Sequence, residues 1–227
     1  MKRNILMLIL LMGSFIAHAQ VTSFVIDSSK FIRPLTKTLD SLYHEDQDGR
    51  MAYTKALNNK EPRTVTDSLR KIMQRKDSSN LVLVCGILDK HGWLSPQKVG
   101  MSASQALFLV IQHANLTTQL KYLPLIRTAE KNKEILSSNL AILEDRVNMR
   151  QGLRQMYGSQ AVRDAASGTM YFYPIEKPEQ LDVRRAAMGL IPMAEYAKAM
   201  NMEWDLSAYQ KNLPAIEEKA RKTGFKN

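Results

Sequence analysis

The segment "ASQALFLVIQHA" constrains the fold more than any other part of the chain. Six apolar residues follow one another from Ala106 to Ile111, so a helix here would be apolar on every side. Such a helix is normally enclosed by other elements and lies at the centre of a core. The rest of the chain must therefore supply elements with apolar faces that cover this segment.

Most of the remaining pattern is helical, with apolar residues three or four positions apart and no internal repeat. Helices are predicted, in chain order, from about Phe31, from a cap at Thr66 or Asp67 up to Gly92, over Leu120–Ala129 and Leu136–Tyr157, and after Pro178, Pro192 and Leu206. The predicted fold class is mainly α, as a single orthogonal or irregular helical bundle.

One short stretch changes its period, near residues 159–174. Alternation there places Thr169, Tyr171 and Tyr173 on one face and Met170 and Phe172 on the other. This period of two predicts a small β-hairpin that turns near residues 165–168.

The N-terminus has the features of a signal peptide. Lys2 and Arg3 precede a largely apolar run, and Ala17-His18-Ala19 matches the small-x-small pattern of a cleavage site. We therefore expect export to the periplasm or beyond the cell, with cleavage before Gln20. Retention of the run as an anchor is the alternative, but the run is short for a span of roughly 20 residues.

The mature chain, residues 20–227, is predicted to be a single, mostly helical domain without a membrane span. Two of the 32 basic residues lie in the leader, so 30 remain against 22 acidic ones, a net charge of +8. This excess favours anionic partners, but the basic residues are scattered, which is typical of a charge that serves solubility alone and argues against nucleic acid. Cys85, the only cysteine, excludes an intrachain disulfide.

Common catalytic and metal-binding signatures are absent. The sequence has no G-x-S-x-G elbow, phosphate loop, H-E-x-x-H or dinucleotide fingerprint. "DQDG" at residues 46–49 starts like a calcium loop, but its glycine comes too early and Leu57 stands where a bidentate Glu belongs. We therefore predict neither a metal site nor a cofactor.

Gln112 and His113 follow the apolar run directly, on a helix with no polar side to spare. A desolvated amide or imidazole needs hydrogen bonds or a cavity, because burying it unpaired costs about 1 to 3 kcal/mol. Two interpretations stay open: side chains that tie helices together, or a ligand-binding or catalytic pair. Acid–base chemistry at His113 would require a cavity and a carboxylate beside it.

The stretch "DRVNMRQGLRQMYGSQ" also sets polar residues on apolar faces. Projected as a helix, Asp145 borders an apolar stripe, and Arg146, Arg150 and Arg154 follow one another at i, i+4 and i+8, with Tyr157 alongside. Gly158 ends the pattern and Gln160 follows. Three arginines on one edge suit a carboxylate or phosphate, whereas the alternative is that their stems cover apolar surface and their heads reach water.

Several motifs together resemble an uncharacterised, mostly bacterial family, domain of unknown function number 6624. They are "QHAN", "LEDRV", "GLRQMYGSQ" and "YPIEKPEQLDVRR", and the resemblance spans about residues 46–196. The family implies no reaction. This chain departs from the family pattern at Asn115, Ser159 and Lys177, where Asp, Thr and an acidic residue are usual, and an amide at Asn115 cannot act as a general base.

Three functions remain open from the sequence. The first is an exported binding protein whose polar pocket takes an anionic or peptide-like ligand, with site residues Gln112, Arg146, Arg150, Arg154, Tyr157, Gln160 and Glu176. The second is an exported hydrolase or lyase with His113 as acid or base, next to Asp145 or Glu176. The third is a structural domain whose polar residues only lock helices together.

Overall fold

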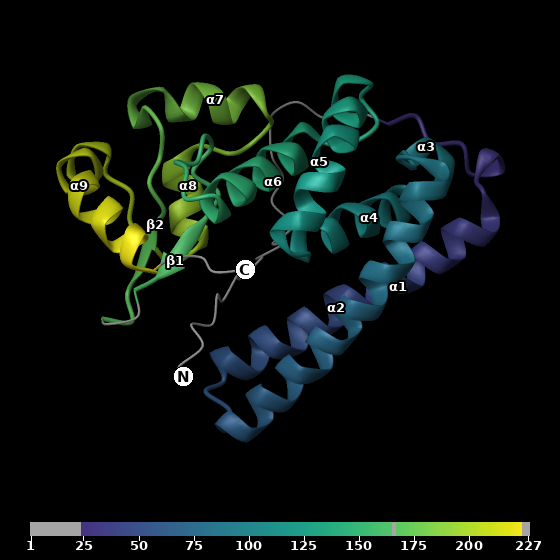
Figure 1. The fold of residues 1–227 in the computed structure, drawn as a ribbon, viewed down its shortest axis with the longest axis horizontal. Helices are drawn as coiled ribbons and strands as arrows, with labels where there is room; N and C mark the ends of the chain where they lie inside the picture. Colours follow the sequence, from purple (N-terminus) through teal and green to yellow (C-terminus); the bar gives the residue numbers. More distant parts are fainter. Residues whose placement is uncertain (1–23, 165–166, 224–227) are drawn as a thin grey trace. The chain divides into compact units, whose positions relative to one another are not determined.

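The computed structural model describes residues 24–164 and 167–223. The predicted signal peptide and residues 165–166 of the predicted hairpin turn lie outside these ranges. Helices dominate, and strands form one small antiparallel pair, which confirms the mainly α class (Figure 1). No helix in the described ranges combines the length and apolarity that crossing a membrane requires.

The described residues form two compact units, and the single domain expected from the sequence stays a prediction. The N-terminal unit covers residues 24–136 and the C-terminal unit residues 137–223. The N-terminal unit contains η1 (Ser28–Lys30), α1 (Arg33–Asn58), α2 (Arg63–His91), α3 (Pro96–Val99), α4 (Met101–His113) and α5 (Leu116–Lys131). Each unit has its own core.

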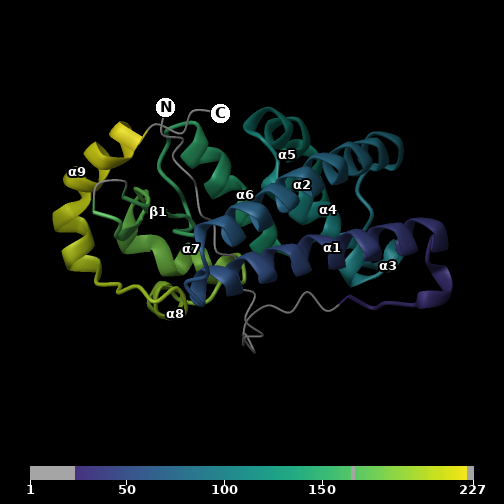
Figure 2. The ribbon, with the colours of Figure 1, turned by 90° about the horizontal axis from the view of Figure 1, so that it is seen from below.

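Helix α4 is the centre of the N-terminal unit, as its apolar run predicts. All six residues from Ala106 to Ile111 are buried. Helix α1 packs along both α4 and α2, and Figure 2 shows α1 and α2 side by side as two long helices. The amphipathic faces of α1 and α2 therefore provide the cover that a helix apolar on all sides needs.

Helix α1 continues through "DQDG" to Asn58, which agrees with the rejection of a calcium loop there. One predicted boundary in this unit was wrong. Helix α2 begins at Arg63 directly after Pro62, and neither Thr66 nor Asp67 caps it. Pro62 explains the early start, because a proline has its φ already fixed near the value that a helix entrance allows. The stop at Gly92 is confirmed, with φ +68°.

The C-terminal unit combines short helices with the hairpin. Its elements are α6 (Ser137–Arg150), β1 (Ala161–Arg163), β2 (Met170–Phe172), η2 (Pro178–Gln180), α7 (Leu181–Ala187), α8 (Met193–Ala199) and α9 (Leu206–Thr223). The predicted hairpin is confirmed, and Val162 pairs with Tyr171 in its antiparallel register. Its faces alternate as expected, since Phe172 joins one apolar cluster and Tyr171 and Tyr173 pack in another.

Helix α6 ends at Arg150, seven residues before the predicted end at Tyr157. The backbone turns at Gly152, which has φ +76°, and the carboxylate of Asp145 accepts the N–H groups of Met156, Tyr157 and Ser159 at 2.6 to 3.2 Å. These bonds hold a loop where the apolar pattern alone predicted helix. The predicted edge of three arginines therefore breaks after Arg150, because Arg154 lies in the loop.

Gly158 completes this loop in a conformation that excludes a side chain. Its φ is +66°, and a Cβ atom there would lie 3.1 Å from the sulfur of Met193 and 3.3 Å from Cδ1 of Ile175. Gly152 has a similar φ of +76° but open space around the Cβ position. A side chain at position 152 would therefore cause backbone strain alone, whereas one at position 158 would cause both strain and steric overlap.

We predict that Gly158→Ala lowers the free energy of unfolding by roughly 2 to 4 kcal/mol, because it adds overlap with buried side chains to the strain of a positive φ. Gly152→Ala, with the strain alone, should cost about 1 kcal/mol. Urea unfolding followed by circular dichroism measures both. Equal losses in the two variants would contradict this packing around Gly158.

Candidate functional site

The first part of the candidate site is a buried carboxylate on α1. Asp46 is 5% exposed and lies one helical turn before Arg50, so both side chains share a face of α1. The guanidinium of Arg50 donates to both carboxylate oxygens, with Nε 3.1 Å from each and Nη2 2.8 Å from Oδ1. The side-chain amide of Gln47 donates a further bond of 2.8 Å. Asp46 is therefore held firmly in the charged form.

The second part is His113, the last residue of α4. Its Nδ1 atom lies 3.6 Å from Oδ1 of Asp46, and its side chain is 9% exposed. This distance is an ion-pair contact and is longer than a hydrogen bond. Such separations are common between a catalytic base and its orienting carboxylate before substrate binds. Helix α4 and helix α1 thus bring together two residues that lie far apart in the sequence.

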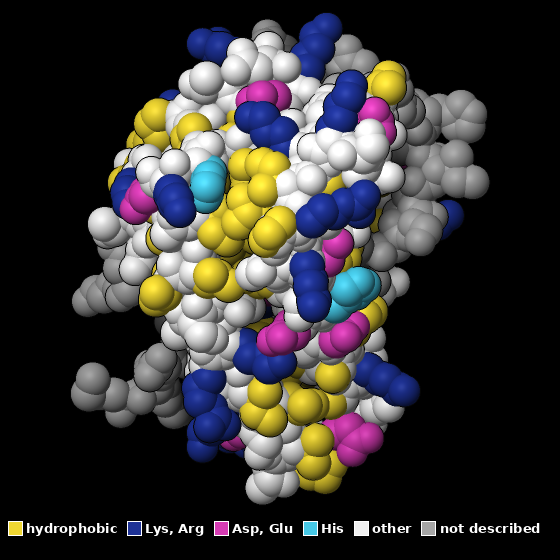
Figure 3. Space-filling model, turned by 90° about the vertical axis from the view of Figure 1, so that its right-hand side faces the viewer, with side chains coloured by type: hydrophobic (Ala, Val, Ile, Leu, Met, Phe, Trp, Pro, Cys, Tyr) yellow, Lys and Arg dark blue, Asp and Glu magenta, His cyan; other side chains and the backbone are white. Residues whose placement is uncertain are grey.

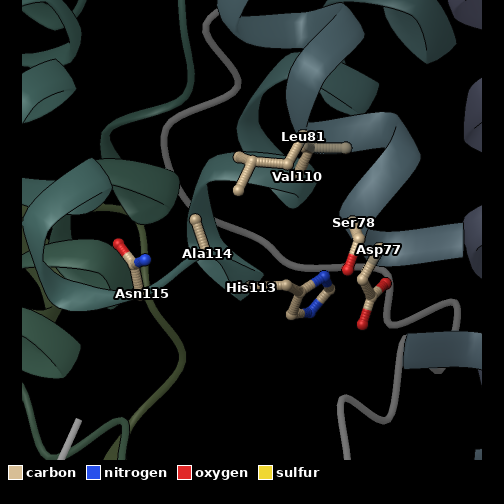
Figure 4. A pocket seen from close by; sticks show the side chains of 7 residues that line it. All are labelled: Asp77, Ser78, Leu81, Val110, His113, Ala114 and Asn115. Carbon is tan, nitrogen blue, oxygen red and sulfur yellow. The ribbon is translucent and has the colours of Figure 1, made fainter. Parts of the chain in front are cut away.

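The third part is a cavity of about 190 Å³ in the N-terminal unit, next to His113. It is lined by Asp77, Ser78, Leu81, Val110, His113, Ala114 and Asn115. In Figure 4 the imidazole extends from α4 toward Asp77 and Ser78 of α2. Nη2 of Arg50 donates to Oδ1 of Asp77 at 2.7 Å, so one guanidinium bridges the buried carboxylate and the carboxylate of the cavity.

The surroundings shift the pKa values of the two carboxyl groups in opposite directions. Burial raises the pKa of Asp46, but the contact with His113 and the bonds from Arg50 outweigh it and hold this pKa well below its usual range. For Asp77 burial dominates and raises the pKa, although Arg50 acts against it. Asp46 therefore stays ionised at neutral pH, and Asp77 takes up a proton more readily than an ordinary Asp.

This arrangement is suited to proton transfer. A carboxylate facing Nδ1 favours the tautomer with the proton on that nitrogen, which leaves the lone pair of Nε2 to accept another proton. The hydroxyl of Ser78 donates to the backbone carbonyl of Gln74 at 3.0 Å, so the structure engages it within α2. Across the described ranges, no group of three His, Cys, Asp or Glu side chains is arranged to hold a metal ion.

A family model described as a family of unknown function, DUF6624, matches residues 34–208 of the chain. The chain belongs to this family. The match confirms the resemblance of the sequence motifs and extends beyond residues 46–196 at both ends, so it includes most of α1. No curated protein and no solved structure matches the chain.

Gln112 and Asn115, on either side of this site in the DUF6624 chain, have structural contacts. Gln112 is completely buried, and its backbone carbonyl accepts a bond from the side chain of Gln119. Asn115 caps α5, where its side-chain oxygen accepts the N–H of Thr118 at 2.9 Å. An Asp could accept the same bond, so the departure from the family pattern at position 115 preserves the cap.

The other predicted site residues belong to the C-terminal unit, where several serve the loop after α6. Asp145 is fully buried, and burial raises its pKa while the backbone N–H groups that it accepts act in the opposite direction. Gln160 is buried too, and its N–H and side-chain amide bond to Gln155 and Ser159. Tyr157 donates its N–H to Asp145. These contacts give Asp145 and Gln160 a structural role.

The arginines of the predicted anion site differ in exposure and in their contacts. Arg146 is 2% exposed, and Arg150 is half-buried at the end of α6, where burial lowers its pKa. Arg154 is exposed in the loop and forms ion pairs with Glu217 at 2.6 Å and Glu176 at 3.4 Å. Arg154 and Glu176, two members of the predicted ligand-binding set, thus meet as a surface pair in the C-terminal unit.

Sequence reasoning identified His113 but missed Asp46, which contacts it, and Arg50 and Asp77, which complete the site. The pair Asp46 and Arg50 has a visible signal, since an acid and a base four residues apart face each other on a helix. The contact of Asp46 with His113 of α4 has no such signal, because it follows from packing between distant segments.

We predict that Asp46→Asn lowers the free energy of unfolding by about 2 kcal/mol at pH 7, because it removes a charged acceptor of Arg50. The pKa of Asp46 is lowered in the folded protein, so its stabilisation is complete above the unfolded value of about 4 and is lost as pH falls through the folded pKa. The difference between wild type and Asp46→Asn should therefore shrink from pH 5 to pH 2.

Urea unfolding at each pH measures this difference. Asp48→Asn is the matched control, since Asp48 is exposed on the same helix. A difference between wild type and Asp46→Asn that stays constant down to pH 2 would show that folding does not lower the pKa of Asp46.

Proposed function

We propose that this protein is an exported enzyme in which His113 acts as general acid and base and Asp46 orients its imidazole. The observation that carries the proposal is the contact of 3.6 Å between a buried carboxylate and a histidine that lines a cavity. A histidine with an orienting carboxylate is a common solution for transferring protons near neutral pH. This role for His113 agrees with one of the functions left open by the sequence, but with Asp46 as the partner in place of Asp145 or Glu176.

The cavity favours hydrolysis by water or an elimination. Ser78 is the only hydroxyl side chain among the described residues that line the cavity. Its hydroxyl donates a hydrogen bond to the backbone carbonyl of Gln74, so no activated protein nucleophile lies beside His113 in this lining. His113 would instead remove a proton from a water molecule or from the substrate itself. Asp77, with its raised pKa, would supply a proton to the leaving group.

The charges of the site favour a substrate that is neutral or cationic where it enters the cavity. Asp46 is ionised and paired with Arg50, and Asp77 adds a second carboxyl group beside the same guanidinium, so the site has no excess positive charge. None of the described residues that line the cavity is Lys or Arg. A volume of about 190 Å³ accommodates a functional group, such as an amide or a sugar hydroxyl pair, and not a whole drug-sized ligand.

A second candidate is non-catalytic binding of a peptide-like ligand in the same cavity. Asp77 and Asn115 both line it: the carboxylate of Asp77 can accept from a peptide N–H, and the amide nitrogen of Asn115, whose oxygen caps α5, can donate to a peptide carbonyl. Binding and catalysis differ in their dependence on His113. A binding protein would keep most of its affinity in His113→Ala, whereas a purely structural domain would lose stability alone.

A panel of neutral and cationic chromogenic esters, amides and glycosides tests the enzymatic proposal with the mature protein. For a substrate that is turned over, His113→Ala should lower kcat by roughly 10²- to 10⁴-fold, the usual loss when a general base is removed. Asp46→Asn should lower kcat with little change in KM and alter the pH dependence of the rate, because it acts through His113.

His91→Ala is the control, since His91 is exposed at the end of α2. Wild-type rates in His113→Ala would refute the acid–base role. Loss of kcat in Asp46→Asn with an unchanged pH profile would mean that Asp46 is only a folding residue.

Export is tested separately by the N-terminus of the protein in its native host. The basic start, the apolar run and the cleavage pattern lead us to expect a mature protein that begins at Gln20. Mass spectrometry of the intact protein and of its N-terminal peptide, after recovery from the periplasm or the medium, identifies this end whether Gln20 is free or cyclised to pyroglutamate. A protein found only in the cytoplasm with an intact leader would contradict export.

A further inference from the structure

The C-terminal unit contains a groove that is separate from the proposed catalytic cavity in its residues and its charge. Its volume is about 430 Å³, within the range of small-molecule sites. The walls come from the end of α6, from the loop after α6, from the segment that follows β2, and from α9. We call it the α9 groove. None of the functions considered for His113 uses it.

One side of the α9 groove is apolar. Met149 and Ala220 are buried and belong to one apolar cluster, and both line the groove. Leu153 lines it as well and leaves 55% of its surface exposed. An occupant with an apolar chain would remove Leu153 from water, which is favourable.

The charged residues of the α9 groove include one cation, Arg221, without a direct ion pair in the described part of the chain. Arg154 and Glu217 both line the groove and pair with each other at 2.6 Å, and Arg154 also pairs with Glu176 at 3.4 Å. Arg221 lines it as well, forms no ion pair within 4 Å among the described residues, and interacts only at longer range with Glu218. A cation beside an apolar wall complements a ligand with one negative group next to an apolar chain.

We propose that the α9 groove binds a small carboxylate that carries an apolar chain, with Arg221 facing the carboxylate and Leu153 covering the chain. Both features are needed, since an inorganic anion would leave Leu153 exposed and an uncharged chain would not use Arg221. An acyl chain and an apolar amino-acid derivative share this chemistry, and they are told apart by the choice of probe.

Calorimetric titration of the mature protein with decanoate and with N-acetyl-leucine tests the proposal. One of the two should bind saturably, and its uncharged counterpart, 1-decanol or N-acetyl-leucine amide, should bind more weakly. Arg221→Ala should weaken binding by about fivefold, the upper range for a solvent-exposed ion pair. Leu153→Ser should weaken binding too. Both side chains are exposed, so both variants are expected to fold.

Lys222→Ala is the matched control. Lys222 is the next residue along α9, pairs with Glu218 at 2.7 Å and does not line the α9 groove. It should leave the affinity unchanged, so a loss equal to that in Arg221→Ala would reduce the effect to net charge and overturn the proposal. Absence of saturable binding for both probes, or binding that neither Arg221→Ala nor Leu153→Ser weakens, would overturn it as well.

Discussion

The structure of each unit depends on how a buried carboxylate is compensated. A carboxylate that leaves water must be paired or hydrogen-bonded, because an isolated buried charge is very unfavourable. Asp145 meets this requirement with backbone N–H groups of one loop. Asp46 meets it with the side chains of Arg50 and His113. The same physical demand thus has two solutions in one chain.

The two solutions have different consequences. Backbone donors occupy the oxygens of Asp145 and fix the chain around it, so this carboxylate stabilises the loop that follows α6. The side chains around Asp46 connect it to a cavity. His113 contacts Asp46 and lines the cavity, and so does Asp77, which accepts a bond from the same Arg50. A compensated charge that reaches a cavity through an imidazole can act on a ligand, whereas one enclosed by backbone cannot. This contrast is the reason for assigning function to Asp46 and His113.

The surface charge adds little to this assignment. On the face shown in Figure 3, Lys and Arg side chains are mixed with acidic and apolar ones and form no continuous basic patch. This distribution agrees with the scattered basic residues of the sequence and with a charge that serves solubility. The individual cations that matter here are Arg50, which is half-buried beside Asp46, and Arg221 at the α9 groove.

Sequence patterns predicted the features that are determined by residues close together in the chain. The apolar run of α4, the alternation of the hairpin and the position of His113 after that run all follow from spacing within one segment. The end of α6 could not be predicted in this way. The apolar spacing continues past Arg150, but the bonds to Asp145 and the turn at Gly152 stop the helix. The pairing of Asp46 with His113 depends on packing between distant helices, which no local pattern encodes.

The tautomer of His113 tests the central claim most directly. Long-range ¹H–¹⁵N correlation spectra of the mature protein, recorded at a pH where the imidazole is neutral, identify the nitrogen that carries the proton. Pairing with Asp46 predicts protonation at Nδ1, and Asp46→Asn should reduce that preference. A neutral ring protonated at Nε2 in the wild type would contradict the orienting role of Asp46 and, with it, the proposed acid–base site.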